Sequence, residues 1–389
     1  MNIVYVIFNI KFGKGGHFHS LLETASKVKE KETITVISLG KYRSPVLDKL
    51  GDDYHHIETN SIITMMLQLQ KMIKKLQPNV INSFDAQSYF FVRLLSNFLK
   101  IPAVLTRCGG PNPKNYYPFC KDMILFSEEN RIHFSNVNKF SLSNLHVVPN
   151  RVPSTSYNQD YNSIKFIKSK LRPDALILLR IARISLAYEK SISQSINLVN
   201  KLAGKGIDAQ LVLVGVIENE NVFSKLKQRS NDNVLFFTQN ELTLNSSKLI
   251  DVADVVIGTG RSFMEGALLN KVMMVPSSNI DVPDLVDISN VFSAFEVNFS
   301  QRFYSNRNSE LIVSKFVNNE IDNDKEELKD FYIRNFSSDK LHERLMPIYR
   351  DASVCDLKIL DTIKNMLFLV RYKSLYVKKW FDFLIRMRK

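Results

Sequence analysis

Along most of the chain, short apolar runs alternate with longer stretches in which apolar residues recur at helical spacing. This alternation is typical of parallel β-sheets whose strands are joined by crossover helices. In the first half, the apolar runs predict strands at residues 3–8, 33–39, 79–84, 103–106, 123–127 and 146–149. Helices are predicted between them at residues 16–28, 62–76 and 87–99.

A second series begins after a polar, turn-rich stretch, residues 151–162, which is expected to be a linker. It predicts strands at 176–181, 210–214, 234–237, 255–257 and 272–276, with helices at 191–202, 221–229 and 263–269. The predicted fold class is therefore α/β, with two doubly wound Rossmann-like domains, 1–150 and 163–340, facing a central ligand cleft. Residues 341–389 are expected to be a C-terminal helical segment.

The length and composition agree with two globular domains. A chain of 389 residues is long for one hydrophobic core, since cores usually stop growing near about 250–300 residues. The 45% hydrophobic and 23% charged residues exclude a disordered or fibrous chain. Three cysteines without close pairing predict reduced thiols in a cytoplasmic protein, and the short N-terminal apolar run predicts a buried strand and not a signal peptide.

The net charge of +13 is concentrated at the end of the chain, which argues against nucleic acid as a partner. Residues 358–389 contain nine Lys or Arg and two Asp, a net of +7. Within this tail, apolar residues recur on one predicted helix face, with basic residues on the other. The apolar positions are Val377, Trp380, Phe381, Leu384 and Ile385. The pattern predicts peripheral binding to the anionic inner face of the cell membrane, or alternatively packing of the helix on the first domain.

Three segments carry candidate chemistry, and the first is a glycine-rich turn after the first predicted strand. Gly13, Gly15 and Gly16 precede a helix, where backbone N–H groups can approach an anion closely. The alternative is a tight turn without a ligand.

The second segment contains two cations after the strand predicted at 176–181. Arg183 and Lys190 fall where open α/β sheets bind ligands and could neutralise a leaving diphosphate. The alternative is a pair of solvated surface cations.

The third segment, residues 253–268, predicts a buried strand, a turn with Gly258 and Gly260, and a helix that Ser262 caps. Such a helix start can hold an anion. The carboxylate of Glu265 is expected to accept hydrogen bonds from ribose hydroxyls. The alternative is that it closes the helix cap, since it stands at capping-box spacing from Ser262.

Together these segments resemble family 4 glycosyltransferases and their GT-B relatives over roughly residues 1–350. The resemblance rests on residues 13–16, the Val-Pro-Asn-Arg-Val segment at 148–152, Arg183 and Lys190, residues 211–215, and residues 260–268. It implies catalytic roles at the donor diphosphate for Arg183 and Lys190 and a ribose contact for Glu265. Residues that bind the donor would be Gly15, Gly16, Gly260, Arg261 and Ser262.

The chain also departs from that family. A second family carboxylate would fall at position 257, where this chain has Ile257, and the interval from Arg183 to Lys190 is seven positions where five is usual. The family's acceptor-side histidines are absent from residues 82–85 and 106–111, so Asp85 and Arg107 are the acceptor-side candidates.

The resulting hypothesis is a metal-independent, retaining transferase without a cofactor. It moves a hexose-type sugar from a nucleoside diphosphate sugar to a glycan acceptor, lipid-linked, in the synthesis of capsule or O-antigen. No Asp-x-Asp at a strand end indicates a metal. Two alternatives stay open, a sugar-nucleotide epimerase of the same fold and a non-catalytic binding protein.

Overall fold

The computed structural model describes residues 1–9, 13–58, 61–113, 117–153, 161–244, 246–354 and 363. The chain divides into two compact units. The first domain comprises Met1–Val148 and the described residues from Lys340 onward, and the second domain comprises Pro149–Asp339. The basic tail at 377–389 lies outside the described residues.

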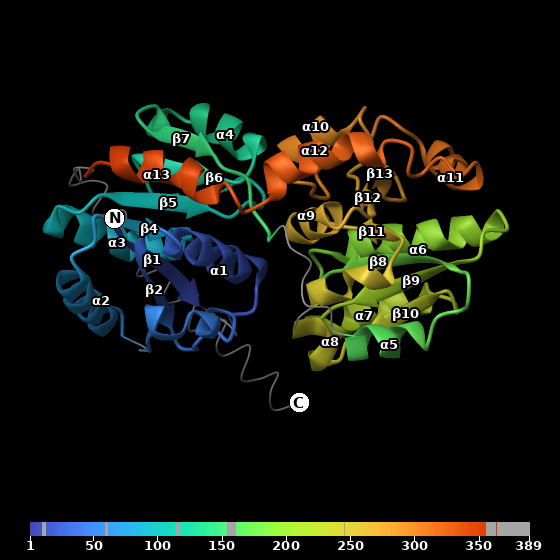
Figure 1. Cartoon of the computed structure of the whole chain (residues 1–389), viewed down its shortest axis with the longest axis horizontal. Helices are drawn as coiled ribbons and strands as arrows, with labels where there is room; N and C mark the ends of the chain where they lie inside the picture. Colours follow the sequence, from blue (N-terminus) through green and yellow to red (C-terminus); the bar gives the residue numbers. More distant parts are fainter. Residues whose placement is uncertain are drawn as a thin grey trace. The chain divides into compact units, whose positions relative to one another are not determined.

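The first domain contains a seven-stranded parallel sheet in the order β3-β2-β1-β4-β5-β6-β7 (Figure 1). Residues 3–8 of its central strand β1 are all hydrophobic because both faces of the sheet are covered. Ile3, Tyr5 and Ile7 face one hydrophobic cluster, and Val4 and Val6 face another. The strands are β1 (Asn2–Asn9), β2 (Thr33–Gly40), β3 (Tyr54–Ile57), β4 (Val80–Ser83), β5 (Ala103–Arg107), β6 (Asp122–Leu125) and β7 (Asn144–Val147).

Helices supply the buried side chains on both faces of this sheet. One face packs against α1 (Gly16–Lys29), the 3-10 helix η1 (Leu47–Asp53) and α13 (Leu341–Asp351). The other packs against α2 (Ile62–Leu76), α3 (Ala86–Leu99), α4 (Glu128–Ser135) and η2 (Asn138–Phe140). The last described helix, α13, is fixed to the first domain because Asn82 Nδ2 donates to Tyr349 Oη at 2.8 Å.

The second domain contains a six-stranded sheet in the order β10-β9-β8-β11-β12-β13, parallel except for β13. Its strands are β8 (Leu176–Ile181), β9 (Ala209–Val214), β10 (Val234–Phe237), β11 (Val255–Ile257), β12 (Val272–Val275) and β13 (Asp284–Leu285). One face packs against α5 (Tyr161–Lys168), α8 (Asn240–Leu244), η3 (Ser246–Val252), α9 (Arg261–Leu268), α10 (Val291–Glu296) and α12 (Lys325–Phe336). The other packs against α6 (Glu189–Gly204), α7 (Glu220–Gln228) and α11 (Ser309–Val317).

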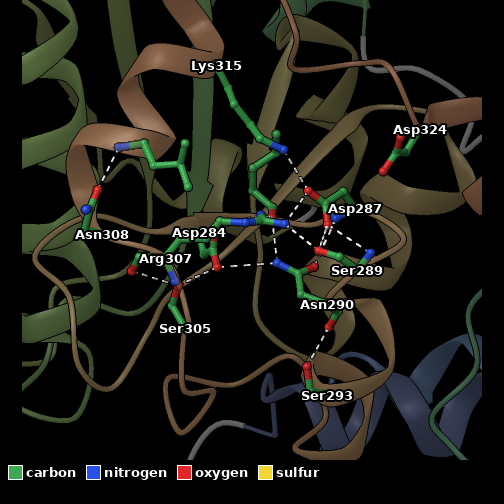
Figure 2. Close-up of polar contacts among 12 residues, drawn as sticks. Asp284, Asp287, Ser289, Asn290, Ser293, Ser305, Arg307, Asn308, Lys315 and Asp324 are labelled. Carbon is green, nitrogen blue, oxygen red and sulfur yellow. Dashed lines mark hydrogen bonds and ion pairs between the residues drawn. The ribbon is translucent and has the colours of Figure 1, made fainter.

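A buried ionic network fixes the β13 edge of the second sheet. Figure 2 shows Arg307 bound to Asp284 and Asp287, with Lys315 reaching Asp287 from α11. Burial raises the pKa of Asp287, but hydrogen bonds from Ser289, Arg307 and Lys315 outweigh it and lower the pKa to about 2. The carboxylate therefore stays ionised, and the network is a structural feature of this edge.

The predicted strands and helices are all confirmed, and their ends differ from the observed ones by at most two residues. The edge strand β3, which contains His55 and His56, was not predicted from the sequence. Tyr54 and Ile57 supply its buried side chains, and Tyr54 Oη lies 2.6 Å from Ser38 Oγ. No helix in the part of the chain that the structure describes is long and apolar enough to cross a membrane.

Candidate functional site

The strand order of the second domain reverses between β8 and β11. Parallel sheets bind ligands at the carboxyl ends of the strands beside such a reversal. Arg180 of β8 and Ile257 of β11 are register partners, so the segments that follow these two strands begin at the same edge (Figure 1). Those segments contain Arg183, Lys190 and the helix α9.

Arg183 is held in place while half of its side chain stays exposed. Its guanidinium lies 5.4 Å from the centre of the Tyr188 ring, and Nη1 lies 3.3 Å from Glu218 Oε1. The exposed fraction of the Arg183 side chain is 54%. An ion pair this exposed stabilises the fold by about 1 kcal/mol at most, so a ligand anion can compete with Glu218 for the guanidinium.

Lys190 is the second residue of α6, and its side chain is exposed. Its Nζ donates to the carbonyl oxygen of Ser278 at 2.6 Å, in the loop that follows β12. The ammonium group is therefore placed beside the carboxyl end of the sheet, on the segment that connects β8 with β9. The helix start beside it adds a partial positive charge.

The turn before α9 differs from the predicted cap. Gly260 occupies the N-cap position with φ 51° and ψ −117°, a conformation that a side chain would strain. Ser262 lies two positions inside the helix, so its assignment as N-cap was wrong. Its Oγ accepts from the Thr259 N–H at 3.1 Å and donates to the Thr259 carbonyl at 3.2 Å, which closes the turn.

Glu265 is almost fully buried, with 6% of its side chain exposed. Its Oε1 accepts from Arg261 Nε at 2.7 Å, and Arg261 Nη1 donates to the Arg151 carbonyl at 3.4 Å. With Gly260 as N-cap, Glu265 is the fifth helical residue and not the third, so the capping-box alternative was wrong. The carboxylate is instead oriented by the arginine one turn before it.

One charged residue at this edge was not identified from the sequence. Arg180 lies inside β8 with no exposed surface. Its Nη1 donates to the Ile257 carbonyl at 3.0 Å, and its Nη2 donates to Ser191 Oγ at 3.1 Å. The available signal was an arginine inside an otherwise apolar strand, because such a position requires a buried polar partner.

The first domain has a second group of candidates at the carboxyl ends of its neighbouring strands β1 and β4. Residues 10–12 of the glycine-rich turn lie outside the described residues. Gly13 has φ 63°, and its carbonyl accepts from Ser44 Oγ at 2.6 Å. Gly15 is the N-cap of α1. Gly16 is the first residue of the helix, and a Cβ added there would meet nothing within 4 Å. A helix start leaves backbone N–H groups without intrahelical acceptors, which suits an anion.

Asp85 is the N-cap of α3 and links it to β1. Its two carboxylate oxygens accept from the N–H groups of Phe8 and Ser88, each at 2.6 Å. Burial raises the pKa of Asp85 to about 6, although both N–H groups lower it. The group therefore changes charge near neutral pH.

Arg107 ends β5, where Nη2 donates to the Pro111 carbonyl at 2.6 Å and the guanidinium lies 5.3 Å from the Tyr117 ring centre. Residues 114–116, between these two partners, lie outside the described residues. Arg107 is thus packed into its own loop, and no hydrogen bond joins it to Asp85 within the described part of the chain. A search for metal ligands found no group of three His, Cys, Asp or Glu side chains suited to an ion among the described residues.

Comparison with known proteins assigns this architecture. Residues 12–126 match the model of the glycosyl transferase 4-like family. A glycosyltransferase from Rickettsia africae has 15% identity and a TM-score of 0.66, covering 90% of this chain and 98% of that chain. HepE from Anabaena, solved with UDP-glucose, has 12% identity and a TM-score of 0.62, covering 88% and 98%. The chain has the GT-B fold.

A GT-B protein of another activity is also similar. The UDP-GlcNAc 2-epimerase from Neisseria meningitidis, bound to UDP-GlcNAc, has 12% identity and a TM-score of 0.55, covering 90% of this chain and 99% of that chain. No curated relative matches by sequence. The family match and the GT-B fold confirm the resemblance drawn from the sequence, and they support glycosyl transfer as the general class of chemistry.

Proposed function

We propose that this GT-B protein is a retaining glycosyltransferase that uses a nucleoside diphosphate sugar. The observation that carries the proposal is the pair of cations, Arg183 and Lys190, at the β8/β11 edge of the second domain. Two fixed cations and a helix start can neutralise the charge that develops on a departing diphosphate. HepE from Anabaena, a similar structure, has been solved with UDP and with UDP-glucose, which supports a nucleoside diphosphate sugar as the donor here.

The remaining donor contacts follow from α9. Glu265 is oriented by Arg261 and can accept hydrogen bonds from vicinal ribose hydroxyls. Gly260 and Ser262, which shape the turn before α9, and Gly15 and Gly16, at the start of α1, are the other proposed donor-binding residues. The acceptor binds to the first domain in this proposal, with Asp85 receiving its hydroxyl proton and Arg107 shaping the neighbouring loop.

The proposal includes metal independence, because Arg183 and Lys190 supply positive charge where a metal ion would otherwise bind the diphosphate. Turnover should then be unchanged by EDTA. Complete loss of turnover with EDTA and recovery with Mg²⁺ or Mn²⁺ would refute this part of the proposal.

The acceptor in this proposal is a lipid-linked glycan, and the pathway is the synthesis of a bacterial surface polysaccharide such as capsule or O-antigen. The support is the basic amphipathic tail, whose residues 358–389 carry a net charge of +7. Such a tail would attach the protein peripherally to the cytoplasmic face of an anionic membrane, where lipid-linked acceptors are found.

A sugar-nucleotide epimerase is the second candidate, favoured by the fold similarity to UDP-GlcNAc 2-epimerase. An epimerase would bind the same donor and need no acceptor. A third candidate is a non-catalytic binding protein, because position 257 holds a buried isoleucine and no carboxylate.

One experiment separates these functions. The protein is incubated with a panel of nucleotide sugars, with and without a lipid-linked glycan acceptor, and products are followed by chromatography and NMR. We expect acceptor-dependent release of nucleoside diphosphate and a product that keeps the anomeric configuration of the donor. Isomerisation without acceptor would indicate an epimerase, and binding without turnover would indicate the non-catalytic protein.

A further inference from the structure

Arg180 is a fully buried cation in β8, an inner strand of the second sheet, next to the last residue of that strand. It stands in β8 between Leu213 of β9 and Ile257 of β11, and 0% of its surface is exposed. Leu178 and Met274 are among the apolar side chains that surround it on this face, and Ser191, which is also buried there, is polar but uncharged. Burial of an ion in such surroundings carries a high free-energy cost unless an opposite charge compensates it.

No carboxylate compensates Arg180 within the described residues. Its Nη1 and Nη2 reach two neutral acceptors, the Ile257 carbonyl and Ser191 Oγ, and its Nε has no acceptor. Burial lowers the pKa of the guanidinium to about 10, which leaves it charged at neutral pH. The residue therefore keeps a positive charge at a place where that charge lowers the stability of the fold.

The groups around Arg180 add positive charge. Ser191, which accepts from Nη2, lies in the first turn of α6 directly after Lys190. Arg183 follows the same strand, and its carboxylate partner Glu218 bonds to Arg183 and not to Arg180. Arg180, Arg183 and Lys190 and the positive end of α6 therefore lie toward the carboxyl end of the sheet, where the acidic side chains Glu218 and Glu189 also lie.

We propose that Arg180 is a positioning residue for the donor diphosphate and supplies buried positive charge behind Arg183 and Lys190. This inference rests on the proposed function. Through its two hydrogen bonds Arg180 joins the end of β11, immediately before the Gly258–Gly260 turn, to the start of α6 beside Lys190. A bound diphosphate would be attracted electrostatically to Arg180 without contacting it, and this attraction would strengthen diphosphate binding.

A purely structural role predicts a different result from this electrostatic role. A residue that only joins β11 to α6 would affect nucleoside and nucleoside diphosphate equally. Buried charge would strengthen binding of the diphosphate alone. The ratio of the two dissociation constants is therefore the informative quantity.

The test measures these constants by calorimetry for the full chain. The probes are UDP, dTDP, GDP and ADP, each with its nucleoside. For the diphosphate that binds best, Arg180→Gln, which keeps hydrogen-bonding groups without charge, should weaken diphosphate binding about 10-fold or more. Nucleoside binding should stay within about threefold. Arg180→Lys should keep the parent ratio, since it keeps the charge.

Arg172→Gln is the matched control. It removes the same charge from the same domain, but Arg172 precedes β8 at its amino end and pairs with exposed Asp208. The ratio of the nucleoside to the diphosphate dissociation constant should be the same in Arg172→Gln as in the parent protein. Arg180→Met serves as a second neutral variant, and thermal unfolding of every variant verifies folding.

Three results would overturn the inference while leaving the proposed function intact. The neutral variants could keep the parent ratio of nucleoside to diphosphate dissociation constants, or they could weaken binding of both ligands equally. Alternatively, Arg180→Lys could change this ratio as much as the neutral variants do. If none of the four diphosphates binds the parent protein, the proposed donor chemistry itself fails, and the inference fails with it.

Discussion

At the scale of single residues, Arg183 and Lys190 are the side chains whose role can be measured most directly. Arg183→Ala and Lys190→Ala should each lower turnover by ~10²-fold or more, the scale for losing one fixed contact to developing charge. Both side chains are exposed, so the free energy of unfolding should change little. Initial rates with donor and acceptor test this.

Lys205→Ala is the control for that pair. Lys205 follows the carboxyl end of α6 and lies 3.9 Å from Glu310, away from the sheet edge that holds Lys190. Its rate should match the parent rate. Rates within threefold of the parent for both Arg183→Ala and Lys190→Ala would remove these residues from the site.

Asp85 predicts a pH dependence. Burial raises its pKa to about 6, so the carboxylate is ionised above this pH and protonated below it. If it receives the acceptor proton, kcat/KM should fall as the pH drops through about 6. Asp85→Asn should lower the rate by ~10²-fold and abolish that step in the profile. A step that persists in Asp85→Asn would assign it to another group.

The sequence predicted site roles for Arg183, Lys190 and Glu265 but not the contacts that orient their side chains. Arg261 and Glu265 are four positions apart on a helix, so their ion pair could have been predicted from the spacing. The partners of Arg180 could not. They come from β11 and α6, and only the fold brings Ile257 and Ser191 to one guanidinium.

At the scale of elements, the start of α1 separates a ligand role from a structural one. A Cβ at Gly16 would meet nothing within 4 Å, and the residue is not in the left-handed region. Gly16→Ala should leave the free energy of unfolding unchanged or raise it by up to about 1 kcal/mol. A donor that approaches this backbone would meet the new methyl group, so KM for the donor should rise about tenfold, the loss expected for one charge-assisted hydrogen bond.

Gly204→Ala is the matched control, because Gly204 ends α6 and also has nothing within 4 Å of an added Cβ. Stability should respond in the same direction while KM stays constant. Thermal unfolding and steady-state kinetics measure both. An unchanged KM in Gly16→Ala would show that the glycine-rich turn is only a turn.

Helices and strands could be predicted where the local pattern of apolar residues was sufficient to identify them. Central strands such as β1 and β8 are apolar because both of their faces are covered, and their residues stand out in the sequence. The edge strand β3 has only four residues, and His55 and His56 conceal its buried pair. The cap of α9 was missed because Gly260 occupies the N-cap position, while the Ser262 hydroxyl closes the turn from inside the helix.

At the scale of the whole molecule, the chain passes from the first domain to the second between Val148 and Pro149 and returns between Asp339 and Lys340. The sequence predicted two α/β domains because its pattern restarts. Packing on the first domain was an alternative only for the tail, and the return of residues 341–351 was not predicted. Buried Leu345, Met346 and Tyr349 on α13 complete a hydrophobic cluster of the first domain. Such packing depends on contacts between residues far apart in the sequence, such as Tyr5 and Tyr349, which no local period reports.

The basic tail gives the last prediction. Residues 358–389 carry a net charge of +7 and the only tryptophan, Trp380. Each Lys or Arg near an anionic leaflet contributes about 1 kcal/mol to binding, and the apolar face adds a hydrophobic contribution. A chain that ends at Tyr372 should therefore keep its melting temperature and its turnover of a soluble acceptor analogue, but lose binding to vesicles that contain anionic lipid. Co-sedimentation with such vesicles measures this.

Ionic strength and lipid charge supply the controls for that truncation. Screening over about 8 Å at physiological salt weakens the electrostatic part of binding and leaves the hydrophobic part, so binding of the full chain should decrease with salt without vanishing. Vesicles of neutral lipid should bind it weakly. If the apolar face packs on the first domain instead, the truncation will lower the melting temperature, and the full chain will ignore anionic vesicles even at low salt. That pair of results would refute the membrane role, because the same apolar side chains cannot be buried in the protein and in the lipid at once.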